Sequence, residues 1–397
     1  MKKVLLGTLA VLTLAACSKD EVVQQNPNDA ISFDVVTNKA VSRAADGYCN
    51  NKKPDDFDVW AKVGTTNYFG KTNYEFDDVS NSWKINTLDG SVRYWPAGGV
   101  DFFAAKNYTG AAADAAVVWD ATQTKPLVIN NYQVEAAPGD QKDFIYAVNM
   151  GATKATPTAP LNFRHALSQI EFMAKNENKN IYVTVQGVKV VNVNDKGNFE
   201  FPILSTDDKV GVDQPGGSYT DDFTGKNQGK WDNLSGTATY VIKTKNATDG
   251  ADADVKLLGN AAKASSLTVS DVSPKEYNSQ TLYVMPQAVD CWDGKGVPSK
   301  AHLVLNCKIW NVAAGDGTED TSGVVLWDGT QDIAVALPAG TKWEQGKRYV
   351  YTFRFTTDGN GGTDPSGNPV FTPITLDVTV DDFVKGADVD TPMVDLP

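Results

Sequence analysis

The stretch LNFRHALSQIEFMAKNENKNIYVTVQGVKVVNV, residues 161–193, decides the fold class. It contains two apolar runs, at residues 161–173 and 181–193, and the polar turn 176–180 (Asn-Glu-Asn-Lys-Asn) joins them. Two runs rich in β-branched and aromatic residues that flank a short polar segment are typical of a β-hairpin. We therefore expect both strands in one hairpin, with no domain boundary between them.

Apolar residues alternate with polar ones over most of the remaining chain. Ile31, Phe33 and Val35 alternate with Ser32 and Asp34 near the N-terminus. Alternation with a period of two, interrupted by Gly, Pro, Asn and Asp clusters, indicates the strands of an all-β sandwich. Further strands are predicted at residues 57–62, 100–108, 127–135, 144–149, 237–243, 280–289, 301–312, 332–337, 348–357 and 370–384. The sequence leaves room only for short helical turns, near residues 111–116 and 258–265.

A long break without a strand pattern separates two halves of the chain. It runs from Leu204 to Trp231 and is rich in Asp, Pro and Gly. Because turns and linkers concentrate these residues, we place a domain boundary in this break. The predicted organisation is a signal peptide (1–16), a tether with a first strand (17–43), an N-terminal β-sandwich (44–204), a C-terminal β-sandwich (205–385) and a C-terminal tail (386–397).

The N-terminus has the pattern of a bacterial lipoprotein signal. Lys2 and Lys3 precede an apolar run from Val4 to Leu14, and Ala15-Ala16-Cys17 follows. A charged start, a short apolar run and small residues before the cut are typical of a secretory signal, and the run is too short for a permanent membrane span. The cysteine directly after the small residues resembles a lipobox, so we predict lipidation, with palmitate, at Cys17. The alternative is an ordinary secretory signal with an incidental cysteine.

The polar segment after Cys17 indicates a location. Ser18-Lys19-Asp20-Glu21 resembles the acidic surface-export signal of Bacteroidetes lipoproteins. Residues 18–30, rich in Gln, Asn and Asp, would serve as a solvated tether in either case. We expect a lipid-anchored protein exposed at the surface of the cell outer membrane.

The charge of the chain excludes some partners. The net charge is −13, and removal of residues 1–16, which contain two lysines and no acidic residue, takes it to −15. Nucleic acids and anionic membranes are bound by clustered Lys and Arg. We therefore expect no nucleic acid partner.

Residue types that carry enzyme chemistry are few. The histidines are His165 and His302, and the sequence has no HExxH, CxxC or GxSxG motif. His165 alternates with Phe163 and Leu167, which favours a core histidine over a catalytic one. Two acidic loops, 249–254 and 316–320, carry the oxygen ligands that Ca²⁺ accepts, but neither fits the EF-hand pattern and a solvated turn is favoured. We expect no enzymatic activity, no cofactor and no metal.

The cysteines and tryptophans leave alternatives open. Three cysteines remain once Cys17 is lipidated, so at most one internal disulfide can form. Cys291 and Cys307 either close a hairpin or are two buried small residues. Nine tryptophans and 14 tyrosines allow a glycan-stacking surface, but sandwich cores use tryptophan equally often, and no binding site is assigned.

Four stretches together carry a resemblance to a known family. They are Tyr94-Trp95-Pro96 with residues 100–104, residues 161–170, residues 343–351 and residues 374–383. Their order and spacing resemble the fimbrillin-like proteins of Bacteroidetes, which supply stalk, tip and anchor subunits of type V pili. The resemblance implies two tandem transthyretin-like sandwiches, export as a lipoprotein and assembly by strand exchange.

The resemblance also implies a processing site. In such pilins an arginine-specific protease cuts after an early arginine and removes the first strand. Arg43, which Ala44 follows, lies where that cut would fall, directly after the strand with Ile31, Phe33 and Val35. Loss of a strand exposes unpaired backbone groups and an apolar groove that a strand of another subunit can fill. An unprocessed linker arginine is the alternative.

The C-terminal tail would supply the donor strand to a neighbouring subunit. Val389, Val394 and Leu396 are the residues expected to insert. However, Pro392 removes a backbone donor and three aspartates must face outward, so the tail departs from a good donor. This departure leaves room for a tip subunit or a stand-alone surface lipoprotein.

The sequence therefore predicts a surface-exposed fimbrillin-like lipoprotein. It would be a structural or accessory subunit, stalk or tip, of a type V pilus (fimbrium), with β-strand complementation as its assembly mechanism and cell adhesion as its role. The expected partners are other pilin subunits, a host or bacterial surface ligand and the outer-membrane lipid anchor. The alternative is a monomeric glycan-binding outer-membrane lipoprotein that uses loop aromatics.

Overall fold

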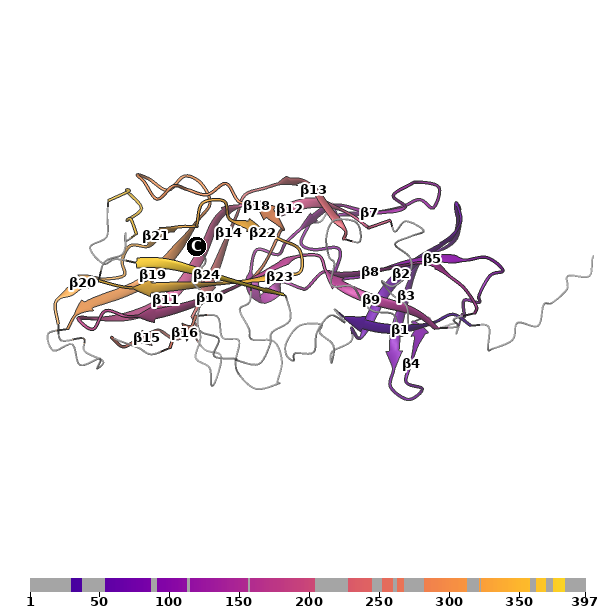
Figure 1. Cartoon of the computed structure of the whole chain (residues 1–397), viewed down its shortest axis with the longest axis horizontal. Helices are drawn as coiled ribbons and strands as arrows, with labels where there is room; N and C mark the ends of the chain where they lie inside the picture. The colour runs from indigo at the N-terminus through magenta and orange to yellow at the C-terminus, as the bar shows by residue number, and fades with distance from the viewer. Residues whose placement is uncertain are drawn as a thin grey trace, which may run out of the picture.

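The computed structural model describes most of the chain and confirms the all-β fold class. The described residues are 30–37, 54–86, 91–112, 115–155, 158–203, 228–244, 252–259, 263–267, 282–312, 321, 323–357, 362–368 and 374–382. Within them the regular structure consists of β-strands and one short 3-10 helix, η2 (Pro138–Asp140). The molecule is elongated, with its N-terminal strands at one end and its C-terminal strands at the other (Figure 1).

A seven-stranded sheet forms the N-terminal lobe. Its strand order is β1 (Ser32–Thr37), β9 (Thr158–His165), β8 (Ile145–Ala152), β5 (Val100–Lys106), β2 (Asp56–Val63), β3 (Thr66–Asp77) and β4 (Ser82–Ile85). One face of this sheet encloses a cluster of buried residues that we call the inner core, which includes Phe57, Phe102 and Phe163. The central strands β2, β5 and β8 carry buried residues on both faces, so their sequences are nearly continuous runs of apolar residues.

A four-stranded middle sheet covers the other face of the lobe. Its order is β13 (Lys230–Ser235), β12 (Lys196–Glu200), β7 (Leu127–Gln133) and β6 (Ala116–Trp119). Trp60, Phe103 and Tyr146 on the outer face of the seven-stranded sheet belong to the same buried cluster as Ile129 and Phe199 of the middle sheet. We call this second cluster the main core.

Two further sheets form a C-terminal sandwich around the remainder of the main core. The first contains β16 (Ser265–Ser266), β10 (Ser168–Asn176), β23 (Lys347–Phe355) and β24 (Ile374–Asp382), and β17 (Leu282–Val284) also pairs with β10. The second contains β14 (Ala238–Lys243), β11 (Ile181–Val193), β19 (His302–Asn311) and β20 (Val325–Trp327), and β15 (Val255–Leu257) and β21 (Ile333–Ala336) pair with β11 and β19. A short pair, β18 (Gln287–Ala288) and β22 (Lys342–Trp343), completes the strands.

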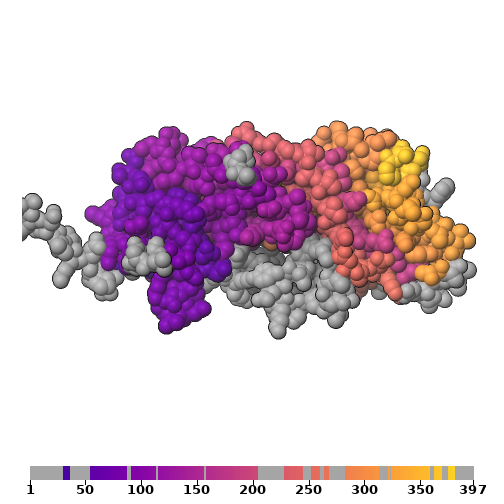
Figure 2. Space-filling model, turned by 180° about the vertical axis from the view of Figure 1, so that it is seen from behind, coloured from indigo at the N-terminus to yellow at the C-terminus, as the bar shows by residue number. Residues whose placement is uncertain are grey.

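The main core joins the two halves of the molecule. β11 ends at Val193 and β12 begins at Lys196, so the chain passes almost directly from the C-terminal sandwich to the middle sheet. The main core accordingly contains residues of both, such as Phe199 from β12 and Val185 from β11. The space-filling view shows the purple and orange parts joined by magenta and salmon residues (Figure 2).

The predicted hairpin of residues 161–173 and 181–193 is wrong. The first run divides into β9 and β10, and β10 pairs with β16, β17 and β23, whereas β11 pairs with β14, β15 and β19. The physical reason is that β10 and β11 both bury an apolar face in the main core, so they lie in different sheets of the C-terminal sandwich. In the connection, the Asn176 and Asn178 side chains accept hydrogen bonds from the backbone N–H groups of Asn178 and Asn180.

The predicted domain limits stay a prediction. The proposed division between residues 204 and 205 falls in the segment 204–227, outside the described residues. The strand pairing adds one fact that bears on it: β10 and β11, which precede that segment, pair in the described part of the chain with strands that follow it.

Candidate strand-exchange site

The first strand, β1, lies at the edge of the seven-stranded sheet. It pairs in parallel with β9, and the register places Phe33 opposite Ala159 and Val35 opposite Leu161. Figure 1 shows β1 beside β9 on the border of the lobe. Among the described strands it has one neighbour in the sheet, so its loss would uncover the backbone groups along β9.

The residues that the alternation pattern assigned to one face of this strand are brought together in the core. Ile31 and Phe33 are each 5% exposed, and Val35 is completely buried. All three belong to the inner core, whereas Asp34 points to solvent and is exposed. The strand therefore has a buried apolar row, and Ser32 and Asp34 lie on its other side.

Phe33 occupies a box of aromatic rings. Its ring centroid lies 4.8 Å from that of Tyr74, 5.3 Å from that of Phe102 and 5.9 Å from that of Phe57. All three pairs have the edge-to-face geometry that aromatic rings prefer. The three rings around Phe33, which we call the aromatic box, come from β2, β3 and β5, so none of them belongs to β1 itself.

Polar contacts fix the beginning of β1. The backbone N–H of Ile31 donates to the carbonyl oxygen of Arg93 at 2.8 Å, and Ala30 forms an isolated bridge with Tyr94. The hydroxyl oxygens of Ser32 and Thr158 lie 3.1 Å apart. Backbone contacts therefore set the register of β1 at its start, and the aromatic box sets it at the centre.

Tyr74 is a buried polar group at the floor of the box. Its hydroxyl is buried and has no hydrogen-bond partner among the described residues, and burial raises its pKa above the ordinary value. The neighbouring Tyr68 hydroxyl donates to the carbonyl oxygen of Tyr94. We call the surface that β1 covers the groove under β1; aromatic rings line it, and the Tyr74 hydroxyl in it has no hydrogen-bond partner among the described residues.

Sequence reasoning found β1 but not its surroundings. Ile31, Phe33 and Val35 lie together as predicted, whereas Phe57, Tyr74 and Phe102 were not assigned to the site because they come from distant strands. β3, which carries Tyr74, was not predicted as a strand. The other predicted site residues, Cys17, Arg43, Ala44, Val389, Val394 and Leu396, lie outside the described residues.

The histidines occupy structural positions. His165 is a buried histidine as predicted, and its Nδ1 lies 2.7 Å from Oδ2 of Asp143. Nδ1 of His302 lies 2.7 Å from the carbonyl oxygen of Lys300, and burial lowers the pKa of His302. Among the described residues no group of three or more His, Cys, Asp or Glu side chains could hold a metal ion.

The two described cysteines are free thiols, so the bridge between Cys291 and Cys307 that the sequence left open does not form. Cys307 is completely buried in the main core, and burial raises the pKa of its thiol well above the ordinary value. Cys291 is partly buried and contacts the carbonyl oxygens of Val289 and Pro338 at 3.4 and 3.5 Å. Both behave as small core or rim residues.

The tryptophans do not form an exposed platform. All nine lie among the described residues, and none is in the exposed class. Five are buried, and these are Trp60, Trp83, Trp95, Trp292 and Trp343. The other four, Trp119, Trp231, Trp310 and Trp327, are partly buried.

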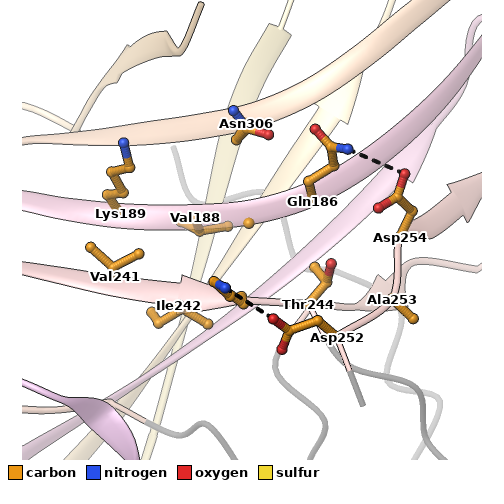
Figure 3. A pocket seen from close by; sticks show the side chains of 12 residues that line it. Gln186, Val188, Lys189, Val241, Ile242, Thr244, Asp252, Ala253, Asp254 and Asn306 are labelled. Atoms are coloured by element: carbon orange, nitrogen blue, oxygen red, sulfur yellow. Dashed lines mark hydrogen bonds and ion pairs between the residues drawn. The ribbon is translucent and has the colours of Figure 1, made fainter. Parts of the chain in front are cut away.

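A pocket of about 340 Å³ lies on the outer face of the C-terminal sandwich, between β11, β14 and residues 252–254 (Figure 3). Lys243 pairs with Asp252 at 3.0 Å, and Gln186 donates to Asp254 at 3.4 Å across its rim. These are the described carboxylates of the first acidic loop, and each has a protein partner. The lining contains no aromatic residue.

The described part of the chain has no helix long and apolar enough to cross a membrane.

One comparison with known proteins identifies a family. The model of the fimbrillin-like family matches residues 42–373. None of the curated protein sequences that were compared matches the chain. One solved structure that the chain resembles is that of a putative cell adhesion protein from Bacteroides uniformis. The TM-score is 0.41 and the sequence identity 13%, and the match covers 90% of this chain and 100% of that one.

Two further structures are similar to the same degree. A putative cell adhesion protein from Bacteroides ovatus has a TM-score of 0.43 and 12% identity, and the match covers 90% of this chain and 99% of that one. One from Parabacteroides distasonis has a TM-score of 0.40 and 10% identity, over 83% and 94% of the two chains.

Proposed function

The chain belongs to the fimbrillin-like family, and we propose that it is a surface-exposed lipoprotein that serves as a structural or accessory subunit of a type V pilus and supports cell adhesion. It would be a stalk or tip subunit that assembles by β-strand complementation. Its lipid anchor would be Cys17 in the outer membrane.

One observation carries this proposal. β1 is an edge strand that buries three apolar side chains, yet it is the first described element and Arg43 follows its last residue, Thr37, by six positions. A cut after Arg43 would leave β1 without a covalent link to the rest of the fold. The strand would then be held by backbone hydrogen bonds and apolar contacts alone, and another strand could replace it.

The energetic scale supports an exchange of strands. Full burial of an apolar side chain contributes roughly 1.5–3 kcal/mol, so three such residues contribute several kcal/mol to β1. A donor strand with similar residues would recover this energy together with the backbone hydrogen bonds along β9. The contacts that complete the fold would thereby become the contacts between subunits.

We propose a structural role without enzymatic activity. The family match, and the histidines in buried contacts with Asp143 and Lys300, support this view. The alternative of a monomeric glycan-binding lipoprotein has less support. The tryptophans are buried or partly buried, and the pocket on the C-terminal sandwich is lined without aromatic rings.

The test compares the natural chain with Arg43→Lys in native outer-membrane material. Lysine keeps the positive charge but is not a substrate for an arginine-specific protease. Unheated denaturing gels of the natural chain should show a ladder of multimers whose N-terminus is Ala44. Arg43→Lys should give one band that begins at the acylated Cys17.

A second variant separates anchoring from assembly. Cys17→Ser should release the protein from the membrane and leave the fold unchanged. A natural chain that gives only a single acylated band beginning at Cys17 would reject the processed pilus subunit.

A further inference from the structure

We infer that the groove under β1 selects a donor strand with the pattern aliphatic-x-aromatic-x-aliphatic, and that this donor belongs to a different subunit rather than to a second copy of this chain. The inference rests on the proposed strand exchange and names the partner that the groove fits. β1 itself serves as the template, because it occupies the groove in the structure.

The central position of the groove is shaped for an aromatic ring. Three rings meet Phe33 edge to face, at centroid distances of 4.8 to 5.9 Å. The rings of the box pack against further aromatic residues. The ring centroids of Phe57 and Phe163 lie 5.2 Å apart, and those of Phe102 and Trp95 lie 5.9 Å apart. Close-packed interiors relax only partly around a missing ring, so a smaller side chain would leave a void.

The flanking positions take aliphatic side chains at fixed spacing. Ile31 and Val35 lie two residues on either side of Phe33, and both are buried in the inner core. Successive side chains of a strand point to opposite faces, so a replacement strand must present its own inserts at positions i, i+2 and i+4. The outward positions, held here by Ser32 and Asp34, can be polar.

The C-terminal tail of this chain does not meet these requirements. From Val384 to Pro397 it contains no Phe, Tyr or Trp. The sets Val389, Thr391, Met393 and Pro392, Val394, Leu396 would place a threonine or a valine in the aromatic box. Both would leave most of the box empty, because neither side chain fills the volume of a phenyl ring.

The last aromatic residue before the tail does not remedy this. Phe383 is flanked at i−2 and i+2 by Asp381 and Lys385, which would bury a charge on each side of the box. Residues 384–397 therefore do not offer the strand that the groove accepts, which favours a donor strand from a different subunit.

The experiment uses the full mature chain, cut after Arg43 with an arginine-specific protease. Fluorescent peptides are added in large excess over the chain's own β1, which remains bound in the groove after the cut. The peptides are residues 29–38, the same peptide with Phe33→Leu, Phe33→Ala or Asp34→Ala, and the tail peptide 387–397. Fluorescence anisotropy measures capture of each. Arg43→Lys, which the protease leaves linked to its own β1 at this site, is the control chain.

The natural peptide should bind the cut chain and fail to bind the control. Phe33→Leu should weaken binding by at least about tenfold and Phe33→Ala by about a hundredfold or more, because the edge-to-face contacts and then the ring volume are lost. Asp34→Ala should bind within about twofold of the natural peptide, because Asp34 points to solvent. The tail peptide should bind at least about a hundredfold more weakly than the natural one.

A reciprocal pair of chain variants tests the box itself. Tyr74→Phe keeps the ring, so this variant should still bind the natural peptide more tightly than the Phe33→Leu peptide. In Tyr74→Leu the difference in affinity between these two peptides should be smaller. Equal binding of the tail peptide and the natural peptide would overturn the inference, as would equal binding of the Phe33→Leu peptide. Failure of the natural peptide to enter the cut chain would instead reject strand exchange itself, and the inference with it.

Discussion

Gly187 adjusts the register of β11, the longest of the described strands. In β11, Val183 and Val185 face the main core, and so do Val188 and Val190, although these two pairs differ in parity. The pairing of β11 with β19 shifts register between Val185 and Gly187, and this bulge adds the residue that restores the inward direction. A β-carbon on Gly187 would lie 2.7 Å from the carbonyl oxygen of Ile242, so the bulge requires glycine.

Substitution of this glycine should be costly. We predict that Gly187→Ala lowers the free energy of unfolding by about 1–3 kcal/mol, because the backbone of β14 must move to admit a methyl group. Gly70→Ala in β3 is the matched control, since a β-carbon there would meet no atom within 4 Å. Denaturant unfolding of both variants measures the difference, and equal stability of the two would contradict the role of the bulge.

His302 predicts a stability that depends on pH. Burial lowers its pKa below the ordinary value of 6.5, and its Nδ1–H donates to the Lys300 carbonyl beside the Trp292 ring. Between the lowered pKa and 6.5 the unfolded chain binds more protons than the folded one. Stability should therefore fall as the pH decreases through this window. Above the window His302 is neutral in both the folded and the unfolded chain, and its titration no longer changes the stability.

The variant His302→Asn keeps a donor near the position of Nδ1 but cannot be protonated there. We predict that its melting temperature falls less than that of the natural chain between about pH 7.5 and about pH 5.5. His165 is present in both chains, so the comparison isolates His302. An unchanged pH dependence would show that this histidine has no part in it.

The inward direction of single residues was predictable, but their neighbours were not. Alternation in the sequence was enough to place Ile31, Phe33 and Val35 on one face, since that depends on local geometry. The box around Phe33 draws Phe57, Tyr74 and Phe102 from three strands far apart in sequence, and no local pattern specifies which strands meet.

Among the elements, strands with a clear apolar alternation were predicted, whereas β3, β6 and β20 were missed. In β3, Thr66 and Asn67 precede the aromatic residues, and Lys71, Thr72 and Asn73 lie between them, so the apolar alternation is weak. β6 and β20 have three or four residues each and are largely exposed. Such segments carry no strong apolar alternation, because few of their side chains need burial.

The false hairpin shows the limit of local signals. Residues 161–193 have the alternation of two strands and a polar connection, but a connection that joins two sheets has the same composition as one that joins neighbours. Three of the four stretches that carry the family resemblance contribute β10, β23 and β24, which are adjacent in one sheet. That adjacency is a long-range fact that spacing along the chain did not reveal.

In the N-terminal lobe, we expect substitutions in β1 to lower the stability most. We predict that Phe33→Ala lowers the stability of the lobe by about 3–5 kcal/mol, because a fully enclosed ring is removed. Asp34→Ala on the same strand should change it by less than about 0.5 kcal/mol. Thermal unfolding and limited proteolysis of the intact chain measure both, and similar values for the two variants would contradict the proposed burial of β1.

At the scale of the whole molecule, two cores share one sheet. Phe102 and Phe103 are neighbours in β5 that face opposite ways: Phe102 belongs to the inner core, and Phe103 belongs to the main core. Phe103 contacts Trp119 of the middle sheet at 5.7 Å and Phe201 at 6.4 Å. The seven-stranded sheet is therefore a partition between two buried regions.

This partition predicts two patterns of hydrogen exchange. Phe102→Ala should speed exchange in strands β1, β2, β3 and β5 and leave β7 and β12 protected. Phe103→Ala removes the same volume on the other face of β5. It should speed exchange in β6, β7 and β12 in addition to β5, because it creates a cavity in the main core. Identical exchange maps for the two variants would show that the two cores unfold as one.

The passage of β11 into β12 has a mechanical consequence. β10, β11, β19 and β23 run along the long axis of the molecule (Figure 1). In the proposed pilus, a subunit held at one end and pulled at the other would be loaded along these strands. A pull along that axis would have to shear the hydrogen bonds between β11 and β19 together, since they lie across the direction of the force. The continuous segment from Ile181 to Glu200 would then connect the C-terminal sandwich to the middle sheet under load, and the molecule would resist stretching along its length far better than peeling from its side.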